Sequence, residues 1–192
     1  MSKKHPNFIF LNRLSPLSES AFNKLESVSV IREFSAGTQI VPIGEISKKM
    51  YMLLSGILRS YIVTEAGKDY TKRIYSPISF AAGLTGLIKE EPSEIGIESL
   101  TNCKLFEICF EGFKQLCREN FEIGRLYVRV LENVFVTYEN RSLDLLRLDA
   151  TEMYMELRKR IPNIDDLIPQ HKIASYLGVT PVQLSRIRKK ID

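Results

Sequence analysis

Hydrophobic and polar positions divide the 192-residue chain into a short N-terminal helix, a strand-rich region and a helical region. The helix is expected at 17–25, with Ser15 as its N-cap and Pro16 at its first position. Short apolar stretches separated by turn residues then follow at the spacing of a small β-sandwich or barrel. The expected strands are 28–34, 38–43, 50–54, 57–63, 70–75, 95–100 and 103–109.

The helical region contains one long segment with two apolar stripes. After a short helix at 113–119, residues 121 to about 148 contain no proline and no interior turn signal. The first stripe is Ile123, Tyr127, Val130, Val134 and Thr137, and the second is Leu126, Leu131, Phe135 and Tyr138. One stripe can pack on the β-domain, and a second copy of the helix is the simplest partner for the other. The alternative is a single wide stripe that is buried within one subunit.

A change of helix is expected at Leu148 and Asp149. The stretch Asp149-Ala-Thr-Glu152 matches a capping box, which starts a new helix that runs through Arg160. Pro162 and Asn163 then end it. We therefore place a domain boundary at this junction, as a hinge between helices.

The C-terminal stretch has the pattern of a helix-turn-helix. Gly178 can take the left-handed conformation that ends a first short helix. Thr180 is the expected N-cap of a second helix, and Pro181 fits its first position. The apolar residues of both helices fall on one inner face: Ile173, Ala174, Leu177, Leu184, Ile187 and Ile191.

The opposite face of the second helix is polar and basic. It carries Gln183, Ser185, Arg186, Lys189 and Lys190, with Arg188 beside them. Lys172 adds to the positive charge of the segment, whose only acidic residue from 170 onward is Asp192. Such a face is the one that a recognition helix presents to the major groove of double-stranded DNA. The simpler alternative is a helical hairpin with a solvated basic face.

Composition is that of an ordinary globular protein, with 44% hydrophobic and 26% charged residues and a net charge of +4. No stretch approaches a membrane span, and the apolar residues at 8–11 are too few for a signal-peptide core. We therefore expect a cytoplasmic protein without membrane contact. Cys103, Cys109 and Cys117 lack metal-ligand spacing and are interpreted as buried free thiols.

A β-roll enzyme or metal protein of the cupin type is the alternative from another functional class. Its site would need histidines and carboxylates clustered on inward-facing strands. The only histidines are His5, in the N-terminal tail, and His171, which opens the helix-turn-helix. We therefore expect no enzymatic activity, no metal and no cofactor, with His171 facing DNA phosphate or solvent.

The order of β-roll, long helix, hinge and helix-turn-helix resembles the CRP/FNR (cyclic-AMP receptor/fumarate-nitrate regulator) family of bacterial transcription regulators. The resemblance rests on Phe34-Ser-Ala-Gly37-Thr-Gln-Ile40 with Gly44-Glu45, Tyr51-Met-Leu-Leu-Ser-Gly56, Asp149-Ala-Thr-Glu152 and the stretch from Ile173 to Lys190. It implies an α+β fold with a cyclic-nucleotide-binding-like β-roll at 1–112, a short helix and long dimerisation helix at 113–148, and a helix-turn-helix (winged-helix-like) domain at 149–192. The implied protein is a homodimeric, sequence-specific DNA-binding regulator, with RNA polymerase as a further partner.

The family's nucleotide-binding cassette is altered in this sequence. The resemblance places Gly83, in Phe80-Ala-Ala-Gly83-Leu84, where relatives have a carboxylate for the ribose, and Ser93 where they have an arginine for the phosphate. Glu94 would repel a phosphate, and Tyr138 is bulky where some relatives have small hydroxyl residues. Because an anionic nucleotide needs charge-assisted hydrogen bonds, cyclic AMP is not expected to bind. The expected pocket for an unknown small-molecule effector is Gly83, Leu84, Ser93, Glu94 and Tyr138.

The recognition helix also differs from that of well-known relatives. Pro181 and Val182 replace a charged pair that reads bases, whereas Arg186 matches a family base contact. Arg186 is expected to bind a guanine edge and Gln183 an adenine, with Ser185 bonding to a base or phosphate. Arg188, Lys189 and Lys190 are assigned to phosphates or solvent. The alternative function is a small-molecule-binding or protein-interaction module that does not read a specific DNA sequence.

Overall fold

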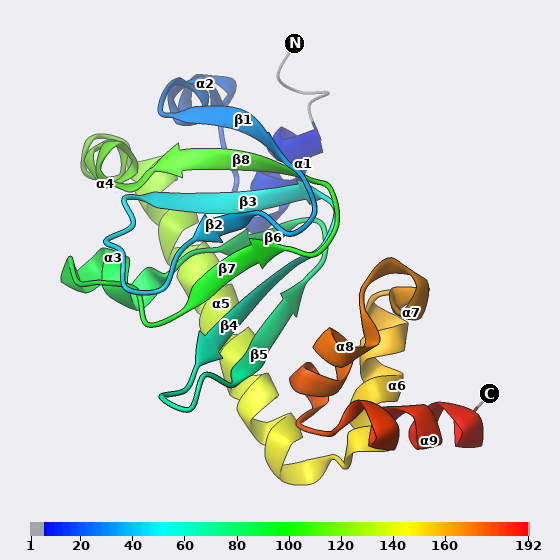
Figure 1. Cartoon of the computed structure of the whole chain (residues 1–192). Helices are drawn as coiled ribbons and strands as arrows, with labels where there is room; N and C mark the ends of the chain where they lie inside the picture. The colour runs from blue at the N-terminus through cyan, green and yellow to red at the C-terminus, as the bar shows by residue number, and fades with distance from the viewer. Residues whose placement is uncertain (1–5, 192) are drawn as a thin grey trace.

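The computed structural model describes residues 6–191 and has the expected α+β fold. Figure 1 shows a β-roll, a long helix that crosses behind it, and a cluster of helices at the C-terminal end. The first four-stranded sheet contains β1 (Ser29–Phe34), β8 (Cys103–Cys109), β3 (Lys49–Ser55) and β6 (Ser79–Ala81), in that order. The second contains β2 (Gln39–Val41), β7 (Gly96–Ser99), β4 (Leu58–Val63) and β5 (Asp69–Tyr75). All of their strand pairs are antiparallel.

The interior of the roll is apolar because alternate residues of both sheets point inward. Leu53, Leu58, Ile97 and Leu105 are completely buried in this cluster, and Val41 lies beside them. Each expected strand is present, with ends within two residues of the prediction. Strand β6 was not predicted because three residues after a turn give too short a pattern to recognise.

Helices flank the roll on several sides. They are α1 (Pro6–Leu14), α2 (Glu19–Ser27), α3 (Leu84–Lys89), α4 (Phe110–Glu119) and α5 (Phe121–Arg147). Neither α1 nor α3 was expected from the sequence. His5 lies outside the described residues, so the expectation for that side chain has no structural counterpart.

The predicted cap of the first expected helix was wrong. Ser18, not Ser15, is the N-cap of α2, and its hydroxyl accepts a hydrogen bond from the Ala21 amide at 3.2 Å. Ser15 is buried and instead accepts a hydrogen bond from Nε of Arg125 at 3.1 Å. A long-range contact therefore determines the role of Ser15, and local pattern could not reveal it.

Helix α5 packs one side against the rest of the chain. Ile123, Leu126 and Val130 are buried against α1, α2 and the roll. The exposed apolar residues of the helix are Phe121, Val128, Phe135, Val136, Leu145 and Leu146. Four of them, Phe121, Val128, Phe135 and Leu146, fall along one line of the helix, here called the outer stripe. The predicted second stripe was thus partly wrong, because Leu126 joins the inner core and only Phe135 of that set is fully exposed. Phe121, Val128 and Phe135 follow one another at steps of seven residues, so they lie on the same exposed face of α5.

The C-terminal helices are α6 (Ala150–Arg160), α7 (Ile164–Leu167), α8 (Gln170–Leu177) and α9 (Pro181–Ile191). The predicted capping box is present, since Oδ1 of Asp149 accepts from the Glu152 amide at 2.8 Å and Oε2 of Glu152 accepts from the Asp149 amide at 2.9 Å. Gly178 ends α8 with φ of 72°, as predicted. Within residues 6–191 no strand follows β8, so the winged-helix likeness is confined to the helix-turn-helix.

These helices share a buried apolar cluster with two residues of the roll. Tyr154, Ile173 and Leu184 form its centre, and Ile57 and Ile74 enter it from the β4–β5 side. The C-terminal helices are therefore docked on the roll as well as being joined to it through α5. Figure 1 shows α8 beside β5 in this arrangement.

Candidate nucleic-acid interface and effector cavity

Helix α9 begins with a reciprocal capping box. The Thr180 hydroxyl accepts a hydrogen bond from the Gln183 amide at 3.2 Å, and Oε1 of Gln183 accepts one from the Thr180 amide at 2.8 Å. The Thr180 cap was predicted, but the role of Gln183 was missed. The signal was present in Thr180-Pro-Val-Gln183, which fits the spacing of the capping-box motif.

One face of α9 is anchored and the other is open to solvent. Leu184 is completely buried, and Ile187 and Ile191 pack partly against the same cluster. The residues predicted to contact DNA lie mainly on the exposed side: Thr180, Pro181, Gln183, Ser185, Arg186, Lys189 and Lys190. The exposed side chains therefore combine hydrogen-bonding groups with three positive charges. That combination suits base edges flanked by phosphates.

Arg188 differs from the other predicted contacts because it has an internal partner. Its Nε lies 3.7 Å from Oδ1 of Asp165, and its side chain is only about a quarter exposed. Asp165 also accepts a hydrogen bond from the Tyr154 hydroxyl at 2.6 Å. Burial and the Asp165 carboxylate raise the pKa of Tyr154, so its hydroxyl stays protonated and donates. Arg188 thus links α9 to α6 and α7.

Two residues at the start of α8 also have distinct environments. His171 is exposed. Lys172 had been counted with the DNA-facing charge, yet its Nζ lies 3.1 Å from Oδ2 of Asp69 on the β-roll. The positive charge of Lys172 is therefore neutralised within the protein, and α8 contributes less charge to the candidate interface than the sequence indicated.

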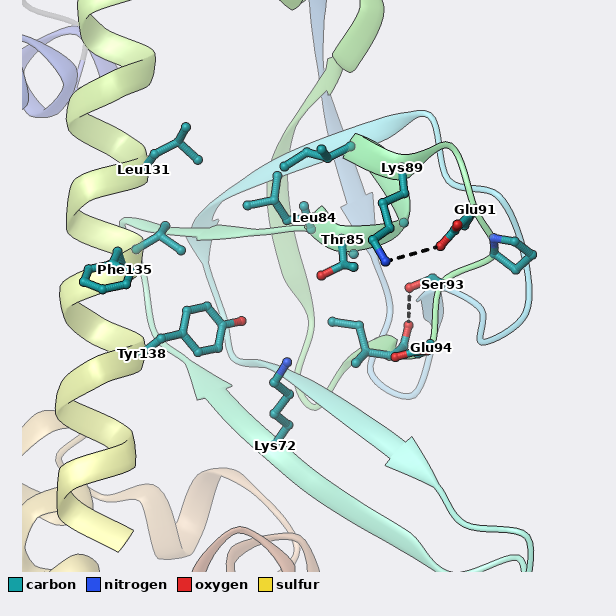
Figure 2. Close-up of a pocket in the computed structure, with 17 residues that line it drawn as sticks. Lys72, Leu84, Thr85, Lys89, Glu91, Ser93, Glu94, Leu131, Phe135 and Tyr138 are labelled. Carbon is teal, nitrogen blue, oxygen red and sulfur yellow. Dashed lines mark hydrogen bonds and ion pairs between the residues drawn. The ribbon is translucent and has the colours of Figure 1, made fainter. Parts of the chain in front are cut away.

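A cavity of about 550 Å³ lies between α3, the following loop and α5. Figure 2 shows side chains of α5 on one side of it and those of α3 and the loop on the other. Gly83, Leu84, Ser93, Glu94 and Tyr138, all predicted as pocket residues, line this cavity together. Sequence reasoning missed Lys72, Thr85, Lys89, Glu91, Leu131 and Phe135, which also line it.

The cavity has an apolar wall and a rim of mixed charge. Leu131, Val134 and Phe135 of α5 form the wall. Lys72, whose Nζ lies 5.2 Å from the centre of the Tyr138 ring, supplies a cation. A second cation, Lys89, is already paired, because its Nζ lies 3.8 Å from Oε2 of Glu91. The lining residues include no arginine, and an anionic phosphate would face the carboxylates of Glu91 and Glu94.

Gly83 and Ser93, which both line the cavity, are in close contact. The buried Ser93 hydroxyl donates a hydrogen bond to the Ile95 carbonyl at 2.8 Å. A Cβ atom at position 83 would lie only 2.5 Å from Oγ of Ser93. A side chain at position 83 would therefore force the Ser93 hydroxyl out of its present position.

Replacement of Gly83 by alanine is expected to displace Ser93 and to lower the free energy of unfolding by about 1–3 kcal/mol, the usual cost of overpacking. Urea denaturation measures this change. In the double variant Gly83→Ala/Ser93→Ala the clashing hydroxyl is absent, so part of the stability should return. An unchanged midpoint for Gly83→Ala alone would contradict the close contact.

The three cysteines differ in their exposure. Cys103 is buried and Cys117 half-buried, but Cys109 is exposed, which corrects the expectation that all three are buried. Burial raises the pKa of Cys117 to about 11, so its thiol is protonated at neutral pH. In the part of the chain that the structure describes, no three His, Cys, Asp or Glu residues are grouped to hold a metal ion.

The described residues also contain no helix that is long and apolar enough to span a bilayer.

Comparison with known proteins gives one family match and many similar structures. Residues 31–120 match the cyclic nucleotide-binding domain family. No curated protein matches the chain in sequence. The c-di-GMP responsive global regulator CLP of Xanthomonas campestris is 15% identical, with a TM-score of 0.69 and coverage of 91% of each chain. FixK2 from Bradyrhizobium japonicum is also 15% identical, with a TM-score of 0.69, over 85% of this chain and 84% of its own.

The Thermus thermophilus catabolite activator protein is 17% identical, with a TM-score of 0.58 over 95% of this chain and 86% of its own. These matches extend beyond the roll to the long helix and the C-terminal helices, because they cover most of each chain. At such low identity they establish the arrangement of elements. Residues 31–120 thus match the cyclic nucleotide-binding domain family, and the chain as a whole has the fold of these three regulators.

Proposed function

We propose that this protein is a homodimeric, sequence-specific DNA-binding regulator of transcription. The observation that carries the proposal is α9, a capped helix that is anchored by Leu184 and exposes a polar and basic face. The wider likeness to regulators of the same fold supports it. The proposed domains are the roll at 1–112 for effector binding, the helices at 113–148 for dimerisation and the helix-turn-helix domain at 149–192 for DNA binding.

The exposed outer stripe of α5 supports the homodimer. A soluble helix rarely leaves a run of large apolar side chains uncovered, and seven-residue spacing suits packing against an identical helix. Phe135 is 65% exposed and Leu146 84% exposed in a single chain. Pairing of two α5 helices would place the two α9 helices at successive major grooves, about 34 Å apart.

The exposed side chains of α9 take different roles in this proposal. Arg186 donates two hydrogen bonds to a guanine edge. Gln183, whose Oε1 accepts from Thr180 at the cap, reads an adenine by donating from its amide nitrogen to the base. Ser185 bonds to a base or phosphate, and Lys189 and Lys190 contact phosphates, with Thr180 and Pro181 at the helix N-terminus. Arg188 supports the orientation of α9 through Asp165.

The cavity beside α5 is the proposed effector site, and cyclic AMP is not its ligand. Its rim holds two carboxylates and no arginine, which disfavours a cyclic phosphate. Its apolar wall belongs to the same helix as the outer stripe. A bound effector could therefore alter the dimer contact and the hinge near Asp149.

Selection of bound duplexes from a random DNA library tests the proposed function. We expect enrichment of a near-palindrome whose half-sites lie one helical turn apart. Arg186→Ala should then lose about 10- to 100-fold in affinity for that site, corresponding to about 1–3 kcal/mol. Arg118→Ala, which removes an exposed arginine from α4, is the matched control and should bind like the parent.

Failure to enrich any sequence would instead favour an interaction module without specific DNA reading. Equal affinities for the parent and Arg186→Ala at moderate salt would remove Arg186 from base recognition.

A further inference from the structure

The edge of the second sheet is covered by the helix-turn-helix. Strand β5 is the last strand of that sheet, so one side of its backbone has no neighbouring strand. The Thr71 amide on this side donates a hydrogen bond to Oγ of Ser175 in α8 at 2.8 Å. The Ser175 hydroxyl in turn donates to the Asp69 carbonyl at 3.3 Å. One side chain of α8 thus takes the place of a strand partner at two alternate residues.

A buried group of charges lies next to these hydrogen bonds. Arg59, on β4, is only 1% exposed. Its guanidinium lies over the Tyr61 ring, with Cζ 4.3 Å from the ring centre. It donates to Oε1 of Glu98 at 2.6 Å and forms a bidentate contact with the Asp69 carboxylate. The hydrogen bonds from Arg59 to Asp69 hold the pKa of Asp69 below its usual range.

Lys172 completes this group from the other domain. Its Nζ lies 3.1 Å from Oδ2 of Asp69 and 3.5 Å from Oε1 of Glu98. Two cations therefore face two carboxylates, so the group is electrically balanced only when α8 is docked. The Lys172 side chain is 19% exposed, which limits the screening of these contacts by solvent.

Further contacts hold α8 from the side of α5. Arg141 donates a hydrogen bond to the Tyr176 carbonyl at 2.8 Å, and its guanidinium lies 4.1 Å from the centre of the Tyr176 ring. These contacts from the roll and from α5 are made by Lys172, Ser175 and Tyr176, which all belong to α8 and not to the exposed face of α9. Docking therefore fixes the orientation of the helix-turn-helix and leaves its candidate DNA face open.

We propose that Lys172, Ser175 and Asp69 form an interdomain latch that sets the orientation of the recognition helix relative to the roll. The consequence for DNA rests on the proposed function: in a dimer, two latched domains hold their α9 helices at a fixed spacing. Lys172 is then a positioning residue that acts through α8, rather than a DNA contact. Release of the latch widens the range of distances between the two α9 helices. It therefore lowers the affinity for DNA only where both half-sites must be bound together.

Amide hydrogen exchange on the full chain tests the latch without DNA. Ser175→Ala removes the acceptor of the Thr71 amide, and Lys172→Met keeps the side-chain length but removes the charge. In both variants the Thr71 amide should exchange about tenfold faster, as expected for loss of one hydrogen bond or charged contact. Lys172→Arg should restore slow exchange. Lys159→Met is the control, because Lys159 is exposed and pairs with Glu156 on its own helix.

Binding of a two-half-site duplex and of a single half-site gives the second measurement. Lys172→Met should lose about tenfold in affinity for the two-half-site duplex and keep the parent affinity for the single half-site. An equal loss on both duplexes would show that Lys172 contacts DNA and would overturn the positioning role. Unchanged exchange of Thr71 in both Ser175→Ala and Lys172→Met would overturn the latch. If the parent binds no DNA, the proposed function fails while the exchange measurement still decides the latch.

Discussion

Replacement of Arg59 by methionine is expected to lower the free energy of unfolding by about 3 kcal/mol, near the lower end of the range for breaking a buried ion pair. The variant would leave Asp69 and Glu98 close together, and among the described residues Lys172 is the cation that would still contact both. We take the lower end of that energy range because the Asp69 side chain is about a third exposed, so solvent screens part of its charge. Urea denaturation followed by circular dichroism measures the loss.

Two further variants make this expectation specific. Arg129→Met removes an exposed arginine that pairs with Glu132 on the same helix, and it should change stability by less than about 0.5 kcal/mol. The triple variant Arg59→Met/Asp69→Asn/Glu98→Gln removes the unpaired carboxylates as well and should recover part of the loss. A loss below about 1 kcal/mol for Arg59→Met would show that the buried charges contribute little to folding.

The same network has a defined pH dependence. Because the Arg59 guanidinium lowers the pKa of Asp69, the native state binds this proton less readily than the unfolded chain does. The resulting stability is present above the unfolded pKa of about 3.9 and is lost as the pH falls through the native value. In Arg59→Met the stability should therefore decrease less steeply with acidification, as pH-dependent urea titrations would reveal.

Substitution of Val128 by glutamate is expected to dissociate the proposed dimer and to weaken operator binding at least about 100-fold, because the second half-site would no longer add its binding energy. Val128 is 53% exposed and lies midway along the seven-residue steps between Phe121 and Phe135. In a symmetric helix pair the substitution would bring two carboxylates together at an apolar contact. Analytical ultracentrifugation measures the dissociation, and operator titration measures the affinity.

Asn140→Glu is the matched control, since it adds the same charge at an exposed position on another face of α5. This control should remain dimeric and bind like the parent. A Val128→Glu protein that stayed dimeric would exclude the outer stripe as the dimer contact.

The strands could be predicted because local signals mark their ends. Gly37, Gly44, Gly56 and Gly67 all have positive φ at turns, where glycine is the residue that adopts this conformation without strain. The segment from 76 to 92 gave no comparable signal. Its strand β6 is short, and Ile78 and Glu90 take positive φ although they are not glycines. Backbone hydrogen bonds hold both residues, because the Ile78 amide donates to the Leu53 carbonyl at 2.7 Å and the Glu90 amide donates to the Gly86 carbonyl at the end of α3. The sequence pattern did not indicate these bonds.

The candidate interface was predicted in outline and corrected in its charges. Caps, turn and apolar face follow from local spacing, so Thr180, Gly178 and Leu184 were placed correctly. Lys172 and Arg188 looked alike in the sequence, but both pair with carboxylates that the fold brings to them. Asp69 lies 103 residues from Lys172 along the chain. The pairing of charges across such a separation depends on how whole domains dock.

The docking of α8 on β5 has a consequence for how this protein is made. During synthesis the roll emerges long before α8, so its edge strand and the apolar residues Ile57 and Ile74 have no cover at that stage. Contacts of such high sequence separation form late. The nascent roll therefore lacks partners for its β5 edge and cover for these apolar residues until the helix-turn-helix has been made and docks on it. A fragment ending at residue 148 would retain that unfinished edge permanently and would be prone to self-association.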